Sequence, residues 1–315
     1  MAEVWTMGEM IVEIMRTETD VSLKEVGLFK GPYPSGAPAI FIDTVARMGH
    51  RAGIIGGVGR DDFGKCLLER LTRDGVDCSQ VIESDRSATG VAFVTYFSDG
   101  SRQFIFHMGN TPAVEPKAPE AEVLAGIRYF HVMGCSLMAD ERFAAEIVKT
   151  MHLARRLGAR VSFDPNIRKE LLRGSSVLSI VKDVFEHTNI FMPGVDELRM
   201  ITGQTTVEVA VAKCFENPNL ELVVLKKGSE GSTIFSRSET CDMGIYPVEV
   251  IDTTGAGDCF DGAFICGLLE NKDIRSAAKI AAAAAALNTH AFGPMEGMIS
   301  PEQVYRIMES NTGCT

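Results

Sequence analysis

The 315-residue chain lacks the long apolar runs, cysteine motifs and basic segments that mark several classes of protein. No uninterrupted apolar stretch approaches the ~20 residues of a membrane-spanning helix, and the first residues lack the basic and apolar regions of a secretory signal. The eight cysteines form no C-x-x-C pair and show no zinc-ligand spacing, which predicts free thiols in a reducing compartment. We therefore expect a cytoplasmic protein with no membrane partner.

Positive charge is also in short supply. The chain has 31 Lys and Arg against 42 Asp and Glu, a formal net charge of −11 at pH 7. This charge argues against nucleic acid as a partner. An acidic body also repels a phosphate-bearing ligand, so such a ligand must be held by local devices such as helix N-termini, a few basic side chains and Mg²⁺.

Apolar β-prone stretches alternate with helical ones along most of the chain, and no linker, long charge run or internal repeat divides it. This order predicts one α/β domain, in which helices cover both faces of a mainly parallel sheet. Strands are expected at 4–14, 52–58, 129–133, 160–164, 190–192 and 220–226. Helices are expected at 39–48, 61–74, 142–157, 195–202, 207–214, 256–270 and 274–289.

Residues 90–108 depart from this alternation. Two β-prone runs, 90–97 and 103–108, flank a turn with the dipeptide Asp99-Gly100, which is a hairpin signal. With a short strand before Lys30, this hairpin predicts a small sheet that projects from the main body. The alternative is an edge hairpin of the main sheet.

The most informative run is residues 252–264, Asp-Thr-Thr-Gly-Ala-Gly-Asp-Cys-Phe-Asp-Gly-Ala-Phe. Apolar residues recur at helical spacing from Ala256 onward, which places Gly255, Ala256 and Gly257 at the first turn of a helix. Backbone N–H groups there have no helical partners and the helix dipole is positive, so the turn favours a phosphate or a developing phosphoryl anion. Asp258 lies within that turn and is positioned to accept a proton from an attacking hydroxyl. The run therefore suits phosphoryl transfer.

This run resembles the C-terminal signature of the PfkB, or ribokinase-like, sugar and nucleoside kinases. Other segments resemble further motifs of that family in the same order: Gly8-Glu9, 35–40, 56–64, 164–168, 193–197 and 226–231. The resemblance covers nearly the whole chain, from Gly8 to about Gly297. It implies a ribokinase-like α/β fold over residues 1–315, with lid segments at about 15–34 and 88–112 that cover the sugar and contribute to a homodimer.

The resemblance also implies roles for individual residues. Asp258 would be the general base, beside an anion hole formed by Gly255, Ala256 and Gly257. The residues implied for MgATP are Lys226, Gly228, Ser229, Gly231 and Glu197. Those implied for the substrate are Glu13, Gly36, Ala37, Asn110 and Arg168. A monovalent cation such as K⁺ would be held by Asp252, Thr254 and Gly293.

Three positions depart from the family pattern. Ser35 stands where a second Gly is usual, and Ile40 stands where an Asn generally helps to hold substrate hydroxyls. Gly194 stands in place of the Asn that precedes Glu197 in the family's N-x-x-E motif. These departures bear on the identity of the sugar and on one polar contact near the metal, and they leave the reaction type unchanged.

Several of these assignments have structural alternatives. Glu13 could be a solvated residue at a strand edge, and Arg168 could belong to a surface ion pair. Glu197 could be a first-turn Glu that the helix dipole favours, and residues 226–231 could be a plain β-turn.

The sequence thus predicts an ATP-dependent carbohydrate kinase that phosphorylates a hydroxyl of a ketohexose-type sugar, tagatose or fructose. One alternative substrate is 2-keto-3-deoxygluconate, whose carboxylate Arg168 would meet. A second alternative is a catalytically silent regulator that binds sugar or nucleotide on the same fold.

Overall fold

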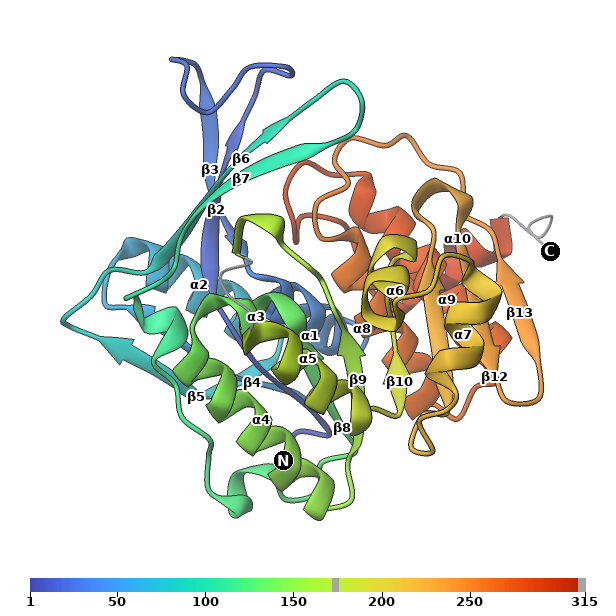
Figure 1. Ribbon diagram of the computed structural model, residues 1–315. Helices are drawn as coiled ribbons and strands as arrows, with labels where there is room; N and C mark the ends of the chain where they lie inside the picture. The colour runs from blue at the N-terminus through green and yellow to red at the C-terminus, as the bar shows by residue number, and fades with distance from the viewer. Residues whose placement is uncertain (172–175, 311–315) are drawn as a thin grey trace.

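Two β-sheets organise the part of the chain that the computed structural model describes, residues 1–171 and 176–310 (Figure 1). The larger sheet has nine described strands in the order β13–β12–β11–β10–β9–β8–β1–β4–β5. Strands β11 to β5 in this order are parallel, and β12 and β13 add an antiparallel edge. The strands are β1 (Val4–Met7), β4 (Ala52–Gly59), β5 (Val76–Ser84), β8 (Tyr129–Met133), β9 (Arg160–Asp164), β10 (Ile190–Phe191), β11 (Leu222–Lys226), β12 (Ser232–Ser236) and β13 (Thr240–Met243).

Apolar residues on both sides of these strands create two separate hydrophobic cores. Neighbouring residues of a strand point to opposite faces, so Val224 joins one core while Val223 joins the other. The first core packs under α1 (Ala37–Arg47), α2 (Asp62–Arg73), α8 (Ala256–Leu269), α9 (Ile274–Thr289) and α10 (Pro301–Ser310). The second packs under α3 (Gly134–Ala139), α4 (Glu141–Arg156), α5 (Ser176–Glu186), α6 (Val195–Thr202) and α7 (Val207–Cys214). The predicted α/β class with helices on both faces is confirmed.

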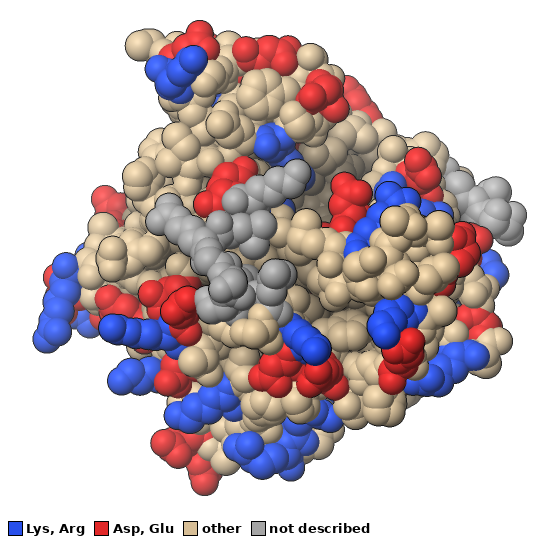
Figure 2. Space-filling view, in the orientation of Figure 1, with Lys and Arg blue, Asp and Glu red and all other residues tan. Residues whose placement is uncertain are grey.

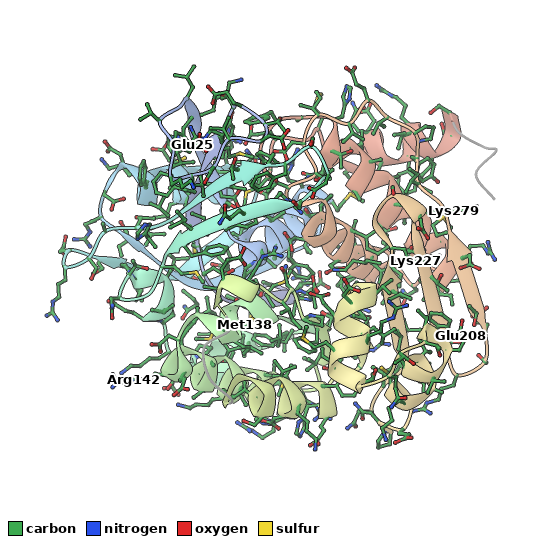
Figure 3. All side chains as sticks on the ribbon, turned by 45° about the horizontal axis from the view of Figure 1, so that its top comes forward. Glu25, Met138, Arg142, Glu208, Lys227 and Lys279 are labelled. Carbon is green, nitrogen blue, oxygen red and sulfur yellow. The ribbon has the colours of Figure 1, made fainter. Side chains whose placement is uncertain are left out.

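A second sheet of four described strands, called here the small sheet, projects from the main body (Figure 1). Its order is β3–β2–β6–β7, with β2 (Ile11–Arg16), β3 (Phe29–Ser35), β6 (Gly90–Tyr96) and β7 (Arg102–His107). Glu25, labelled in Figure 3, lies in the segment that connects β2 and β3. The hairpin predicted around Asp99-Gly100 therefore belongs to a separate sheet, and the edge-hairpin alternative is wrong. The strand expected before Lys30 is also misplaced, because β3 begins at Phe29 and runs on to Ser35.

The predicted strand at 4–14 is wrong as a single element. Its first part, β1, pairs with β4 and β8 in the large sheet, whereas β2 pairs with β3 and β6 in the small sheet. The break falls at Gly8, where a Cβ atom would lie 2.2 Å from Pro38 Cγ and 2.5 Å from Ser136 Oγ. Both halves are apolar because both are buried, so hydrophobicity alone does not mark the change of sheet.

The other predicted elements are found within a few residues of their expected bounds. Further elements that the sequence did not predict are β5, β12, β13, α3, α5 and α10, together with the 3₁₀ turns η1 (Pro112–Val114), η2 (Ala121–Leu124), η3 (Lys169–Leu171) and η4 (Gly228–Glu230). Within the described ranges, none of the helices combines the length and the apolar character that crossing a bilayer requires.

Candidate active site

A cavity of about 210 Å³ lies where the parallel strands end and the small sheet begins. The main body lines it with residues at or just after the carboxyl ends of five strands: Glu9, Cys135, Asp164, Gly194 and Lys226. Strand order reverses between β1 and β8, and such a switch point is where ligands collect in open α/β sheets. The small sheet lines the opposite side with Ile11, Glu13, Arg102, Phe104 and Phe106. Figure 2 shows acidic and basic side chains interspersed over this face of the molecule.

The N-terminus of α8 enters this cavity at a position that only glycine suits. Gly255 is the N-cap, with φ of 78°, in the left-handed region that favours glycine. A Cβ atom there would lie 2.5 Å from the carbonyl oxygen of Pro294 and 3.2 Å from Ile40 Cγ2. Ile40 is itself buried and lines the cavity. The departure at Ile40 therefore places an aliphatic group against the Gly255 loop, where the family's Asn would offer a polar one.

Asp258 sits in the first turn of α8 with its carboxyl group almost fully buried. Asn166 Nδ2 donates a hydrogen bond to Asp258 Oδ1 at 2.9 Å. Burial raises the pKa of Asp258 to about 7, and the negative charge of Asp164 adds to the increase. The cations Arg168 and Lys226 act in the opposite direction. A carboxyl group with a pKa near neutrality is a stronger base than an ordinary aspartate and is half ionised at that pH.

Lys226, at the end of β11, lies between two buried carboxylates. Its Nζ atom is 2.7 Å from Asp164 Oδ2 and 2.8 Å from Asp261 Oδ2. Burial lowers the pKa of Lys226, but the two carboxylates outweigh burial and raise it above its usual value. For Asp261, burial prevails and raises the pKa well above its usual value, whereas Lys226 holds the pKa of Asp164 low in spite of burial. The ammonium is thus committed to a protein network at the floor of the cavity.

Glu197 joins the two loops that follow β9 and β10. Its Oε1 accepts a hydrogen bond from the Ile167 N–H, and its Oε2 accepts one from the Gly194 N–H, both at 2.7 Å. Burial raises the pKa of Glu197, and Asp164 raises it further. Glycine at position 194 therefore still provides a backbone donor, although it offers no side-chain amide.

Two glutamates line the side of the cavity that faces the small sheet. Glu13 Oε1 accepts a hydrogen bond from Ser35 Oγ at 2.7 Å, and Glu13 Oε2 is buried with no partner among the described residues. Glu9 accepts hydrogen bonds from Ser136 Oγ at 2.5 Å and from Cys135 Sγ at 3.1 Å. Burial raises the pKa of both glutamates. Glu13 is therefore no solvated edge residue, and its second oxygen remains available to a ligand.

Two arginines bring positive charge to the same cavity. The Arg168 guanidinium lies 5.7 Å from the centre of the Phe104 ring. Burial lowers the pKa of Arg168, but Cys135, Asp258 and other acidic neighbours outweigh it and raise that pKa. Arg102 reaches the cavity from β7 and donates from Nη1 to Thr254 Oγ1 at 3.2 Å. Arg168 thus lies inside the cavity, which excludes a plain surface ion pair.

The loop before α8 is closely hydrogen-bonded. Asp252 Oδ1 accepts from the Thr254 N–H at 2.9 Å, and Asp252 Oδ2 accepts from the Gly293 N–H at 3.0 Å. Tyr96 OH lies 2.9 Å from Thr254 Oγ1. Asn288 Nδ2 donates to the Thr254 carbonyl oxygen at 3.0 Å, while Asn288 Oδ1 is buried without a partner among the described residues. The loop therefore gathers several oxygens, one of them unsatisfied, next to the start of α8.

Comparison with known proteins decides the family. A family model described as "pfkB family carbohydrate kinase" matches residues 1–301. The chain is 30% identical over 317 residues to Fructokinase-1 of Oryza sativa subsp. japonica, covering 97% of each protein, and 30% identical over 273 residues to Fructokinase-2 of Solanum habrochaites, covering 85% of this chain and 82% of that one. A solved E. coli protein, titled as a candidate Ribokinase II in complex with ATP and Mg²⁺, is 37% identical with a TM-score of 0.92, covering 98% of this chain and all of that one.

This chain belongs to the PfkB family of carbohydrate kinases. It is an ATP-dependent sugar kinase with a ribokinase-like α/β fold, and its substrates are small molecules. The resemblance inferred from the sequence motifs is confirmed, and membership of an enzyme family argues against a silent regulator.

The structure brings many of the residues that the PfkB resemblance implied to one place. Those that line the cavity are Glu13, Gly36, Ala37, Arg168, Glu197, Lys226, Thr254, Gly255, Gly257 and Asp258. Ala256 is the first residue of α8 between two lining glycines. Asp252 and Gly293 contact Thr254 or its neighbours just behind the lining. Four residues that the resemblance implied do not line the cavity: Asn110, Gly228, Ser229 and Gly231.

Asn110 differs from the other residues predicted to bind substrate, which line the cavity. It is exposed, in the left-handed region with φ of 60°, in the turn after β7. It lies outside the cavity lining, and its contact with substrate stays a prediction. Gly228 and Gly231 also have positive φ, in the turn around η4, which explains glycine there without reference to a ligand.

The cavity suits a divalent cation that accompanies ATP. The carboxyl groups of Asp164, which is buried, and Glu197, which is half-buried, both lie there. The negative charge of Asp164 raises the pKa of Glu197, so a cation at this place would relieve repulsion that the protein alone only partly offsets. Oxygen ligands of this kind are those that Mg²⁺ prefers, with water and phosphate completing its shell.

Sequence reasoning missed several residues that shape the PfkB site. Asn166 was part of a recognised motif, but its bond to Asp258 depends on a backbone with φ of 38° that no pattern marks. Glu9 belongs to the recognised Gly8-Glu9 pair after the first strand, but its place in the cavity lining was not predicted. Arg102 and Tyr96 gave no signal, since they flank a hairpin turn far from residue 254 in sequence.

Proposed function

We propose that this kinase transfers the γ-phosphoryl group of MgATP to a hydroxyl of a ketohexose, fructose or tagatose, with Asp258 as the general base. The observation that carries this proposal is the buried Asp258 carboxyl group, with a pKa of about 7, in the first turn of α8, where backbone N–H groups lack acceptors within the helix. Fructokinase relatives at about 30% identity support a ketohexose as the acceptor.

Asp258 takes the proton of the attacking hydroxyl in this proposal. Asn166 holds one carboxylate oxygen through its amide, which leaves the other oxygen for the sugar. Transfer occurs late, because bond formation to phosphorus makes the attacking oxygen acidic. Positioning and charge stabilisation then supply most of the rate enhancement, as in other phosphoryl transfers.

The anion hole is assigned to the backbone N–H groups of Gly255, Ala256 and Gly257. Gly255 and Gly257 line the cavity at the first turn of α8, where N–H groups lack acceptors within the helix and the positive end of the helix dipole lies. The Ala256 N–H donates to the Thr253 carbonyl oxygen at 3.3 Å and would release it to bind an anion. Arg168 adds a full positive charge near Asp258. These donors stabilise the charge that develops on the transferred phosphoryl group.

On the nucleotide side, we assign the ATP phosphates to the region of Lys226 and Glu197, and the rest of the nucleotide to the turn that contains Gly228, Ser229 and Gly231. Glu197 and Asp164 would hold Mg²⁺ through water, and the ion when bound neutralises phosphate charge. Since Lys226 Nζ already binds Asp164 and Asp261, it acts on ATP mainly as a fixed positive charge.

On the sugar side, we assign hydroxyl binding to Glu13 and to the backbone of Gly36 and Ala37. Glu13 Oε2 is buried and unpartnered among the described residues, so a sugar hydroxyl there would satisfy it. Ser35 holds the other oxygen of Glu13 and thereby orients the carboxyl group. The serine that departs from the family pattern thus has a physical role beside the glutamate that replaces the more usual aspartate.

The small sheet is assigned the role of a lid that closes over the sugar. Its Tyr96 and Arg102 side chains reach Thr254, immediately before the anion hole. The homodimer remains a prediction; the small-sheet region exposes the apolar side chains Val26, Leu28 and Ile105, which a second copy would cover. The cytoplasmic location also remains a prediction.

A monovalent cation, K⁺ in the first instance, is proposed beside Asp252, Thr254 and Gly293. The unsatisfied Asn288 Oδ1 atom next to the Thr254 carbonyl group supports an oxygen-lined cation site. Gly293 offers its N–H to Asp252 rather than to an ion, so its part in this site would be to orient Asp252.

One alternative acceptor deserves a direct comparison, 2-keto-3-deoxygluconate. The Arg168 guanidinium, half-buried in the cavity, favours it, because a planar guanidinium matches a carboxylate. ADP formation should be measured with fructose, tagatose, 2-keto-3-deoxygluconate, ribose and nucleosides. The highest kcat/KM with a ketohexose supports the proposal, and the highest with the sugar acid replaces it. Tight ATP binding without turnover on any acceptor would favour the silent regulator.

A further inference from the structure

Three side chains of types that bind metals, His152, Asp183 and His187, lie close together on and next to α4 and α5. His152 comes from α4, Asp183 from α5, and His187 follows the last residue of α5. Asp183 Oδ2 lies 3.8 Å from His152 Nε2, and Asp183 Oδ1 lies 3.2 Å from His187 Nδ1. One ligand atom from each of the three lies within 4.8 Å of the others. None of the three lines the active-site cavity.

The backbone fixes this arrangement. Asp183 and His187 are four residues apart and therefore lie on one side of α5. Helices α4 and α5 lie side by side in Figure 1 and are in contact, with Ile147, Met151 and Val184 in the same core. The two imidazole rings meet edge to face, with centroids 4.6 Å apart. All three side chains remain about one-third exposed, so an ion from solvent can reach them.

The spacing approaches that of a tetrahedral transition metal, and His187 Nδ1, which also lies 2.9 Å from the Asp183 carbonyl oxygen, would exchange that contact for the ion. Ligand atoms at about 2.0–2.2 Å from Zn²⁺ are roughly 3.3–3.5 Å from one another, close to the separations around Asp183. At 3.8 Å, His152 Nε2 is too far from Asp183 for a hydrogen bond, so this nitrogen does not depend on the carboxylate for its orientation. Two imidazoles with one carboxylate suit Zn²⁺, Co²⁺ or Ni²⁺, whereas Mg²⁺ prefers oxygen ligands.

We propose that His152, Asp183 and His187 form a binding site for a divalent transition metal of the Zn²⁺ class, with water as the fourth ligand, and that the ion links α5 to α4. The position has a functional consequence. Helix α5 lies in sequence between the segment with Arg168 and the segment with Glu197, both of which line the cavity. An ion that restrains α5 therefore alters kinase turnover from outside the active site.

The test uses the full chain without a histidine tag, freed of metal and titrated with ZnCl₂ by calorimetry. Co²⁺ absorption in the visible range reports ligand geometry, and a thermal melt reports the restraint of the fold. The variants are His152→Ala and His187→Gln, either of which removes one ligand from a partly exposed position. The matched control is His290→Ala, because His290 is exposed and lies outside the cluster.

The proposal expects saturable Zn²⁺ binding and a raised melting temperature in the parent and in His290→Ala. Affinity should fall more than ~10-fold in His152→Ala and in His187→Gln, and MgCl₂ at the same concentration should not mimic the shift. Equal Zn²⁺ affinity in all four proteins, or no saturable binding in the parent, overturns the site. Kinase turnover that Zn²⁺ changes in the parent and not in His152→Ala supports the link to the active site; turnover unchanged in both overturns that link.

Discussion

Arg102 on the small sheet donates a hydrogen bond to Thr254 Oγ1, two residues before the first helical residue of α8. Tyr96 is the register partner of Arg102 across β6 and β7, and its hydroxyl reaches the same Thr254 oxygen. Two strands of the small sheet thus converge on the loop that leads into the proposed anion hole. In the proposed lid role of the small sheet, its closure and the position of Gly255 are linked through Thr254.

We predict that Arg102→Ala lowers kcat by roughly 10-fold, since a hydrogen bond to a charged group contributes about 1.5–3 kcal/mol. The Gln103→Ala variant is the matched control, because Gln103 is the next residue on β7 and is exposed. A double-mutant cycle of Arg102→Ala with Thr254→Val should show a non-additive effect on kcat. Purely additive losses would mean that Arg102 acts on the substrate and not through Thr254.

Asp258→Asn should lower kcat by at least ~10²-fold, the lower end expected for removal of a general base. The amide retains the shape of the carboxyl group and still offers an oxygen to Asn166, so the fold and ATP binding should persist. Steady-state kinetics and equilibrium ATP binding test this together. Turnover close to that of the parent would remove Asp258 from its assigned role.

The pH dependence of kcat/KM follows from the same residue. Because burial raises the pKa of Asp258 to about 7, the base form is lost as the pH falls below that value. We predict that kcat/KM for the sugar rises with pH up to about 7 and then levels off, with a slope of one proton on the acidic side. A profile that is flat from pH 5 to 8 would contradict a base of this pKa.

The raised pKa also has a consequence for stability. The folded state binds the Asp258 proton more tightly than the unfolded state, whose pKa is near 3.8. This carboxyl group therefore stabilises the fold only while protonated, and its unfavourable effect is complete above pH 7. Asp258→Asn should melt at a higher temperature than the parent at pH 8, and the difference should shrink as the pH falls and vanish only below the unfolded pKa of 3.8. The opposite order at pH 8 would show that Asp258 is not strained by burial.

The sequence predicted the parts of the site whose chemistry is local. Residues 252–258 form a loop and a helix start from consecutive positions, so spacing alone located Gly255 and Asp258. The missed contacts are non-local. Arg102 and Tyr96 reach Thr254 only because the chain passes from the large sheet to the small one between β1 and β2, and β2 pairs with β6 there. The mostly apolar residues 4–14 do not mark that change of sheet.

Glu13→Gln should raise the KM for the sugar at least ~10-fold and leave the KM for ATP unchanged, because the lost interaction is a charge-assisted hydrogen bond of about 1.5–3 kcal/mol. Ser35→Ala should have a smaller effect in the same direction, since it releases Glu13 Oε1 without removing the carboxylate. Glu25→Gln, at the exposed connection between β2 and β3, is the matched control. A change in the KM for ATP would place Glu13 on the wrong side of the cavity.

Lys226→Met should destabilise the protein strongly, by about 3–5 kcal/mol, because it leaves Asp164 and Asp261 buried without their cation. Asp261→Asn should cost less, since Lys226 keeps Asp164 as a partner and Asp261 itself tends toward the protonated form. Lys227→Met is the matched control, because the Lys227 ammonium lies 3.8 Å from the largely exposed Asp242. Urea unfolding measures all three. If Lys226→Met unfolds at the same urea concentration as the parent but loses ATP affinity, the ammonium serves the nucleotide and not the buried carboxylates. If Lys226→Met unfolds at a lower urea concentration, any loss of ATP binding follows from the disrupted cavity.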